Sequence, residues 1–129
     1  MFNYRDLKHL LPQRLFLAIY VVCFAIGGIN HARDFMIYGP RPYSWGPPLL
    51  EAFWTALMFL DAAVVFLLLL GKRRLGLLLA LVVMILDVTA NSYAALVLKI
   101  AGFEIALPLQ SAFLGFVIGS TPFLWPTAK

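Results

Sequence analysis

The sequence predicts an all-α membrane protein, a polytopic bundle in which four helices cross the bilayer. Of the 129 residues, 63% are hydrophobic and 12% are charged, whereas soluble domains are about half apolar and about a quarter charged. The apolar residues form four long stretches separated by short polar segments. Each stretch approaches the roughly 20 residues that a membrane-crossing helix needs. A soluble fold of this length has too little interior to bury so much apolar surface. We therefore expect one transmembrane domain over residues 1–129.

The first helix is expected over residues 14–33. Residues 1–13 form a polar, partly amphipathic lead that ends near Pro12, and we expect this lead to lie along the membrane interface. We interpret the first helix as retained rather than cleaved, because no clear small-x-small cleavage site follows it and three more apolar stretches come later. Residues 38–48 contain four prolines and two glycines, which predict a loop.

The other three helices are expected over residues 48–70, 75–98 and 103–124. Gly71 closes the second helix and opens a tight turn, whereas Lys99 and Gly102 mark the turn before the fourth. Pro108 falls in the first turns of the fourth helix, and Pro122 marks its end.

The distribution of Lys and Arg predicts that both termini face the cytoplasm, where cationic loops concentrate. With four crossings, seven of these residues share a side with the termini: Arg5, Lys8, Arg14, Lys72, Arg73, Arg74 and Lys129. The other side holds three: Arg33, Arg41 and Lys99. Because the cations lie in loops between apolar helices, we expect the bilayer as partner and no nucleic acid.

Two aspartates fall in the middle of predicted helices, where an ionisable residue costs about 2.5–3.5 kcal/mol. Asp61 lies about 18 Å below the outer end of its helix, counted from Leu49, and Asp87 lies about 18 Å above the inner end of its helix, counted from Leu75. In a hydrocarbon core about 30 Å thick, their carboxyl groups therefore differ in depth by only several ångströms. Further polar residues extend a seam towards the outer face: Asn91, Asn30, His31, Glu51 and Trp54. The seam has a structural interpretation, in which hydrogen bonds fix helix register. It also has a functional one, in which it lines a ligand pocket or a proton path.

Small residues predict where membrane helices approach closely. Gly115 and Gly119 form a GxxxG motif on the fourth helix, and Gly76 and Ala80 form a weaker motif on the third. Packing inside the bundle and homodimerisation both explain the GxxxG motif. Neither is excluded by the sequence.

Several common chemistries have no motif in this chain. It contains no GxSxG, CxxC or HExxH sequence, and no glycine-rich phosphate loop. Cys23 is the only cysteine, so no internal disulfide forms. We therefore expect neither a metal site nor a cofactor.

Three segments resemble the small four-helix bacterial membrane proteins of the DoxX-like group. They are Arg14 at the start of the first helix, the run GGINHARDF from Gly27 to Phe35, and the turn KRRLG from Lys72 to Gly76. The resemblance implies a four-helix protein of the bacterial inner membrane, in some cases linked to redox or respiratory partners. It implies no catalytic residue, and Asp61 and the string DVTAN from Asp87 lie outside it.

Three functions follow as hypotheses. We favour a non-enzymatic bundle that supports a membrane partner, either another protein or a second copy of the chain. The second is a pocket for a hydrophobic ligand, or an isomerase-like enzyme using Asp87, Glu51 and His31 as acid–base groups. The third is a small proton-coupled transporter that works as an oligomer, with Asp61 and Asp87 as proton carriers.

Overall fold

The computed structural model describes residues 4–127 as four α-helices. They are α1 (Tyr4–Tyr38), α2 (Pro48–Leu69), α3 (Arg73–Leu96) and α4 (Phe103–Leu124). Each of the four is long and apolar enough to cross a membrane, and no strand occurs in the described residues. The prediction of an all-α protein with four apolar helices is thus confirmed, and the composition indicates an integral membrane protein.

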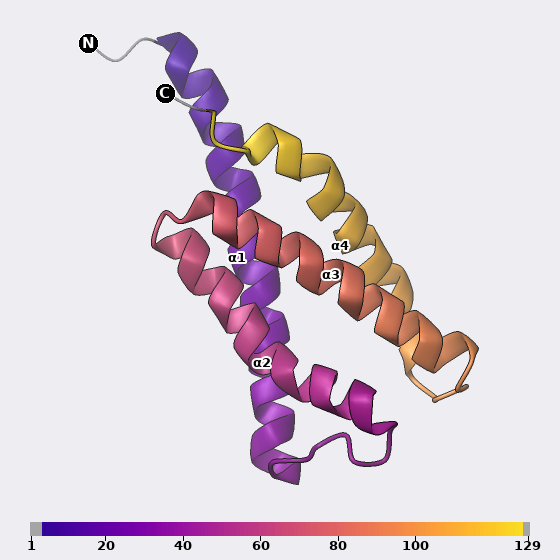
Figure 1. The fold of residues 1–129 in the computed structure, drawn as a ribbon. Coiled ribbons are helices and arrows are strands. Elements are labelled where there is room, and N and C mark those ends of the chain that lie inside the picture. The colour runs from indigo at the N-terminus through magenta and orange to yellow at the C-terminus, as the bar shows by residue number, and fades with distance from the viewer. Residues whose placement is uncertain (1–3, 128–129) are drawn as a thin grey trace.

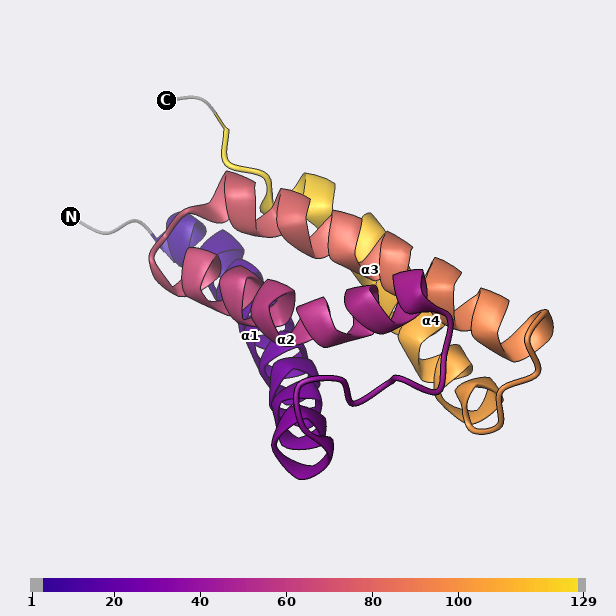
Figure 2. The ribbon, with the colours of Figure 1, turned by 60° about the horizontal axis from the view of Figure 1, so that its bottom comes forward.

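The chain runs up and down through the bundle (Figure 1). Both termini and the α2–α3 turn lie at one end, which we call the terminal end. Residues 39–47 and 97–102 lie at the opposite end, the loop end (Figures 1 and 2). Consecutive helices pack against each other, whereas α1 and α4 make less contact than any consecutive pair and diverge towards the loop end.

Proline interrupts the helices less than the sequence predicts. α1 is continuous from Tyr4 through Pro12 to Tyr38, so the separate lead and the expected range of 14–33 are wrong over the described residues. Residues 1–3 of that lead lie outside them. Pro122 lies in the last turn of α4, which ends at Leu124 as predicted. A lone proline removes one backbone hydrogen bond and bends a helix, but good helix formers on both sides let the helix continue.

Each of the two short connections contains a glycine in the left-handed region. Gly71 has φ +74° after α2, and Gly102 has φ +99° before α4. The amides of Gly71 and Lys72 donate to the carbonyls of Leu68 and Leu67, at 3.1 and 2.8 Å, which satisfies the last turn of α2. α2 and α3 end within one to two residues of the predicted positions, and α3 begins two residues early, at Arg73.

Tyr20 joins α1 to α4 near the terminal end. Its side chain is fully buried, and its hydroxyl lies 2.9 Å from Ser120 Oγ and 3.1 Å from the carbonyl oxygen of Val117. Ser120 itself donates to the carbonyl of Phe116 at 2.6 Å, so Ser120 Oγ and the Val117 carbonyl are two acceptors that share the single Tyr20 hydroxyl hydrogen. Aromatic rings of both helices surround this bond: Phe16, Phe24, Phe113, Phe116 and Phe123. Close contact between α1 and α4 is therefore anchored here.

The two predicted small-residue motifs occupy different environments. Gly76 and Ala80 are buried, and a Cβ at Gly76 would lie 2.5 Å from Leu68 Cδ2 and 2.9 Å from Leu68 Cγ. Gly115 and Gly119 are exposed, and a Cβ at either would meet nothing within 4 Å. Packing of the GxxxG motif inside the bundle is thus wrong for this chain, because the motif faces outwards from α4.

Adding one methyl group at each motif separates the two environments. Gly76→Ala should lower the midpoint of thermal unfolding, because overpacking against Leu68 costs about 1–3 kcal/mol. Gly119→Ala should leave the midpoint unchanged or raise it, because alanine favours helix and meets no neighbour. Fluorescence-monitored unfolding in detergent measures both, and equal losses would contradict the outward position of Gly119.

Candidate functional site

A cavity of about 600 Å³ lies where α1 and α4 diverge. All four helices contribute to its wall, which is mostly apolar but contains five polar side chains besides the Cys23 thiol. These five are Asn30, His31, Asp61, Asp87 and Gln110. Ile26 and Leu109 also line it and are 55% and 78% exposed, so the cavity opens sideways at an apolar rim.

The two adjacent glycines of α1 make room for Asp61. A Cβ at Gly27 would lie 2.7 Å from Asp61 Oδ2, and one at Gly28 would lie 3.3 Å from Asp61 Cβ. A larger residue at Gly27 would therefore displace the Asp61 carboxyl group, and one at Gly28 would press on Asp61 Cβ. Asp61 is buried, yet it makes no hydrogen bond to any other described residue. Its carboxyl group thus lines the cavity without a partner, close enough to Asp87 for the two to repel when charged.

Asn91 is the centre of a hydrogen-bond network that holds Asp87. Its side-chain oxygen accepts from the indole N–H of Trp54 at 2.8 Å. Its amide nitrogen donates to Asp87 Oδ1 at 3.0 Å and to Gln110 Oε1 at 2.9 Å. Both amide hydrogens are then used, which fixes the orientation of the Asn91 amide. One residue thereby links α2, α3 and α4 and sets the position of the Asp87 carboxyl group.

A second network runs from α1 into the loop over 39–47. The hydroxyl of Tyr43 donates to Asp34 Oδ2 at 2.9 Å and lies 2.8 Å from His31 Nδ1. A hydroxyl has a single hydrogen, so His31 Nδ1 must be the donor in the second contact. Burial and the Asp34 carboxylate raise the pKa of Tyr43 far above its usual value, so the phenol stays protonated. The neutral His31 ring then keeps Nε2 as an acceptor.

A smaller cavity of about 230 Å³ adjoins the first and shares His31, Asp87 and Gln110 with it. Aromatic rings pack beside it: Trp54 stacks on Phe103 with centroids 5.0 Å apart, and the ring centroid of Trp45 lies 5.7 Å from that of Trp54. The polar residues of this cavity therefore lie next to a cluster of aromatic rings.

Glu51 is placed differently from the rest of the predicted seam. It pairs with the Arg41 guanidinium through two bonds of 2.7 and 2.9 Å, and it lines neither cavity. The carboxylate in turn raises the pKa of Arg41. This bidentate pair ties the loop to the first turn of α2.

The structure thus brings most of the predicted seam together. Asp61, Asp87, Asn30 and His31 line the larger cavity, and Asn91 and Trp54 line the smaller one next to it. Asn30 is exposed at the rim. Sequence reasoning missed Gln110 and Tyr43, which bond to Asn91 and His31. A lone Gln inside an apolar helix was a usable signal, whereas Tyr43 looked like an interfacial aromatic residue.

The cavity is equipped for binding and for proton transfer. Its polar groups are two carboxyls, two amides and one imidazole, which accept, donate or exchange protons. In the described residues, no three His, Cys, Asp or Glu side chains are grouped closely enough to hold a metal ion.

Comparison of the chain with protein-family models, with curated proteins and with solved structures finds no match. The similarity to the DoxX-like group therefore stays a prediction.

Proposed function

We propose that the protein resides in the bacterial inner membrane with both termini in the cytoplasm. The termini and the turn containing Lys72, Arg73 and Arg74 lie at the same end of the bundle, as this orientation requires. The bias of cations towards that end supports the cytoplasmic side for it.

Cysteine labelling in intact cells tests the orientation. In a Cys23→Ser background, Ser44→Cys at the loop end should react with a membrane-impermeant maleimide. Thr127→Cys at the terminal end should react only after the inner membrane is permeabilised. The reverse pattern, or labelling of both sites in intact cells, would contradict the proposal.

We further propose that the larger cavity binds a small lipophilic molecule with a cationic amine head group. The observation that carries this proposal is that two carboxyl groups, Asp61 and Asp87, face one cavity whose described lining contains neither Lys nor Arg. A buried carboxylate is costly unless it is paired, and a bound ammonium group supplies the missing partner.

The shape of the cavity supports the same ligand class. Its volume of about 600 Å³ falls within the roughly 300–1,000 Å³ of small-molecule sites. Phe24, Val83, Met84 and Phe113 offer an apolar wall for a hydrocarbon tail. The exposed rim at Ile26 and Leu109 leads to the lipid phase in a membrane, so a lipophilic ligand reaches the acids without crossing water.

Cys23 provides a built-in reporter of occupancy, because it lines the cavity and is the only thiol in the chain. In nanodiscs, dodecylamine should slow the alkylation of Cys23 by N-ethylmaleimide, whereas dodecanoate should not. Asp61→Asn and Asp87→Asn should each raise the dodecylamine concentration needed for this protection by about ten- to a hundredfold. This factor corresponds to the roughly 1.5–3 kcal/mol that a hydrogen bond to a charged group contributes.

Glu104→Gln is the matched control, since it removes an exposed carboxylate outside both cavities. It should leave the protection unchanged. Equal protection by dodecylamine and dodecanoate would show that hydrocarbon alone fills the cavity, and the carboxyl groups would then have no role in recognition.

The enzymatic and transport hypotheses involve the same residues, but the positions of these residues give each hypothesis less support. An isomerase-like site would rely on Asp87 and His31, because Glu51 is engaged with Arg41 outside the cavities. Proton transport would need a path from Asp61 and Asp87 to both ends, and the cavities beside these acids share no lining residue with the cavity at the terminal end. Ligand binding is therefore the function that this geometry supports best.

A second candidate function is the support of a membrane partner through α4. The outward position of Gly115 and Gly119 favours it, because small residues on an exposed membrane helix permit close approach of another helix. We propose a second copy of the chain as this partner.

Sedimentation in detergent tests for the homodimer. The double substitution Gly115→Ile and Gly119→Ile should convert a dimer to a monomer without unfolding it, because neither site has a neighbour within the chain. Ala52→Ile, at an exposed small residue of α2, should leave the dimer intact. A parent protein that is monomeric at all concentrations would exclude this candidate.

A further inference from the structure

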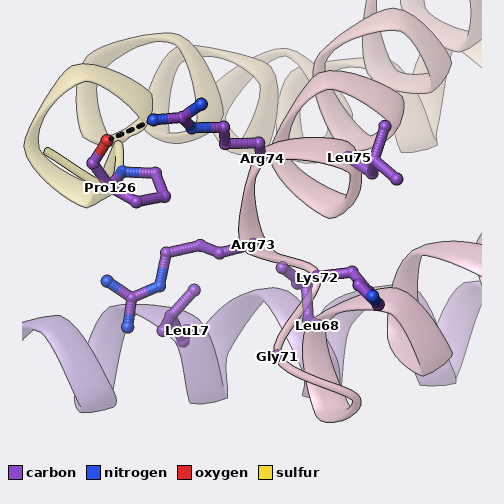
Figure 3. A pocket seen from close by; sticks show the side chains of 8 residues that line it. All are labelled: Leu17, Leu68, Gly71, Lys72, Arg73, Arg74, Leu75 and Pro126. Atoms are coloured by element: carbon purple, nitrogen blue, oxygen red, sulfur yellow. Dashed lines mark hydrogen bonds between the residues drawn. The ribbon is translucent and has the colours of Figure 1, made fainter. Parts of the chain in front are cut away.

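A separate cavity of about 770 Å³ lies at the terminal end, away from the acidic residues. Three consecutive cations of the α2–α3 turn line it, namely Lys72, Arg73 and Arg74, and no acidic side chain occurs in its described lining. Figure 3 shows Arg73 and Arg74 extending to the same side, over α1 and towards Pro126, whereas Lys72 points the other way. The cavity is thus a strongly cationic site at the edge of the apolar bundle.

Both guanidinium groups keep donors available. Arg73 donates to Gln13 Oε1 and Arg74 to the carbonyl oxygen of Pro126, each at 3.4 Å, which is long for a hydrogen bond. Each guanidinium has five N–H donors, so these weak contacts leave most of them unused. The paired orientation in Figure 3 suits an anion with several oxygens, such as a phosphate group.

The start of α3 adds to the attraction for an anion. The cap residue Lys72 makes no side-chain capping bond, and the first turn of α3 contains no acid. The amide groups of a first turn lack helical partners and carry partial positive charge. Here they adjoin the same cavity as the two arginines.

Apolar side chains continue the cavity beneath the cations. Leu17 and Leu68 are partly buried, and Leu75 is 58% exposed on the outer surface of α3. Cations above a leucine surface, at the end of apolar helices, match the order of charge and hydrocarbon in a phospholipid.

We propose that this cavity binds the phosphate head group of an anionic membrane lipid, with Arg73 and Arg74 as the anion ligands and Leu75 against an acyl chain. The proposal rests on the helices crossing a membrane, as proposed above. It is independent of the ligand in the other cavity, because the two sites share no residue.

The test compares lipids and variants with the purified full chain in neutral detergent. Phosphatidylglycerol should bind by native mass spectrometry, whereas phosphatidylcholine with the same acyl chains should bind more weakly. Replacing both arginines, Arg73→Gln with Arg74→Gln, should weaken phosphatidylglycerol binding about thirtyfold, at about 1 kcal/mol per cation. Each single substitution should weaken it about fivefold, which keeps the test usable if the double variant does not fold.

The matched control removes two cations at the loop end, Arg33→Gln with Lys99→Gln, so that the net charge falls equally. This control should bind phosphatidylglycerol like the parent protein. Equal losses in both double variants would reduce the effect to general charge attraction and overturn the proposal. Unchanged binding in the arginine variants would also overturn it.

Inorganic phosphate distinguishes the two sources of the anion. It should not displace phosphatidylglycerol at concentrations equal to those of the lipid, because it lacks the acyl chain that contacts Leu75. Displacement at equal concentration would show a site for a free anion and overturn the assignment to a lipid.

Discussion

In an apolar environment, a buried polar group must find a partner inside the protein, and this constraint organises the interior of the bundle. Asn91 is the clearest case, since its amide connects Trp54, Asp87 and Gln110 across three helices. Tyr20 does the same for α1 and α4, through the hydroxyl of Ser120 and the carbonyl of Val117. These bonds hold the helices at defined positions where apolar attraction gives no preference. Asp61 departs from the pattern because its carboxyl group has no described partner, and it lines the cavity of about 600 Å³ between the four helices. The proposed ligand site is thus one place where the internal satisfaction of polar groups is incomplete, and the buried Thr55 hydroxyl of α2 is another.

Close helix contact and open space occupy different parts of the bundle along its length. Aromatic packing around Tyr20 holds α1 and α4 together near the terminal end. Beyond it, α1 packs against α2 at Gly27 and Gly28, and α4 packs against α3. The space that results is bounded by all four helices, and the rings of Trp45, Trp54 and Phe103 pack together towards the loop end. A cavity with an exposed apolar rim at Ile26 and Leu109 suits a ligand that arrives from the lipid phase.

The sequence predicted the elements better than the contacts between them. Long apolar stretches and the glycines at 71 and 102 placed three of the four helices within about two residues, because length and turn chemistry are local properties. The helical period also placed Asp87 and Asn91 on one face, and they are bonded. The bond from Gln110 and the pairing of Glu51 with Arg41 depend on how distant segments pack, which no local pattern records. The same applies to Gly115 and Gly119, whose spacing is that of a packing motif but whose direction depends on the rotation of α4.

The ion pair between Arg41 and Glu51 has a consequence for how the chain is made. In the proposed orientation, the segment between α1 and α2 is carried across the membrane during biosynthesis, together with its charges. Arg41 and Glu51 lie ten residues apart, and their bidentate pair needs the folded loop and the first turn of α2, so it forms once both residues have crossed. The pair then fastens the proline-containing segment to the first turn of α2. This contact thereby anchors the translocated segment on the far side of the membrane.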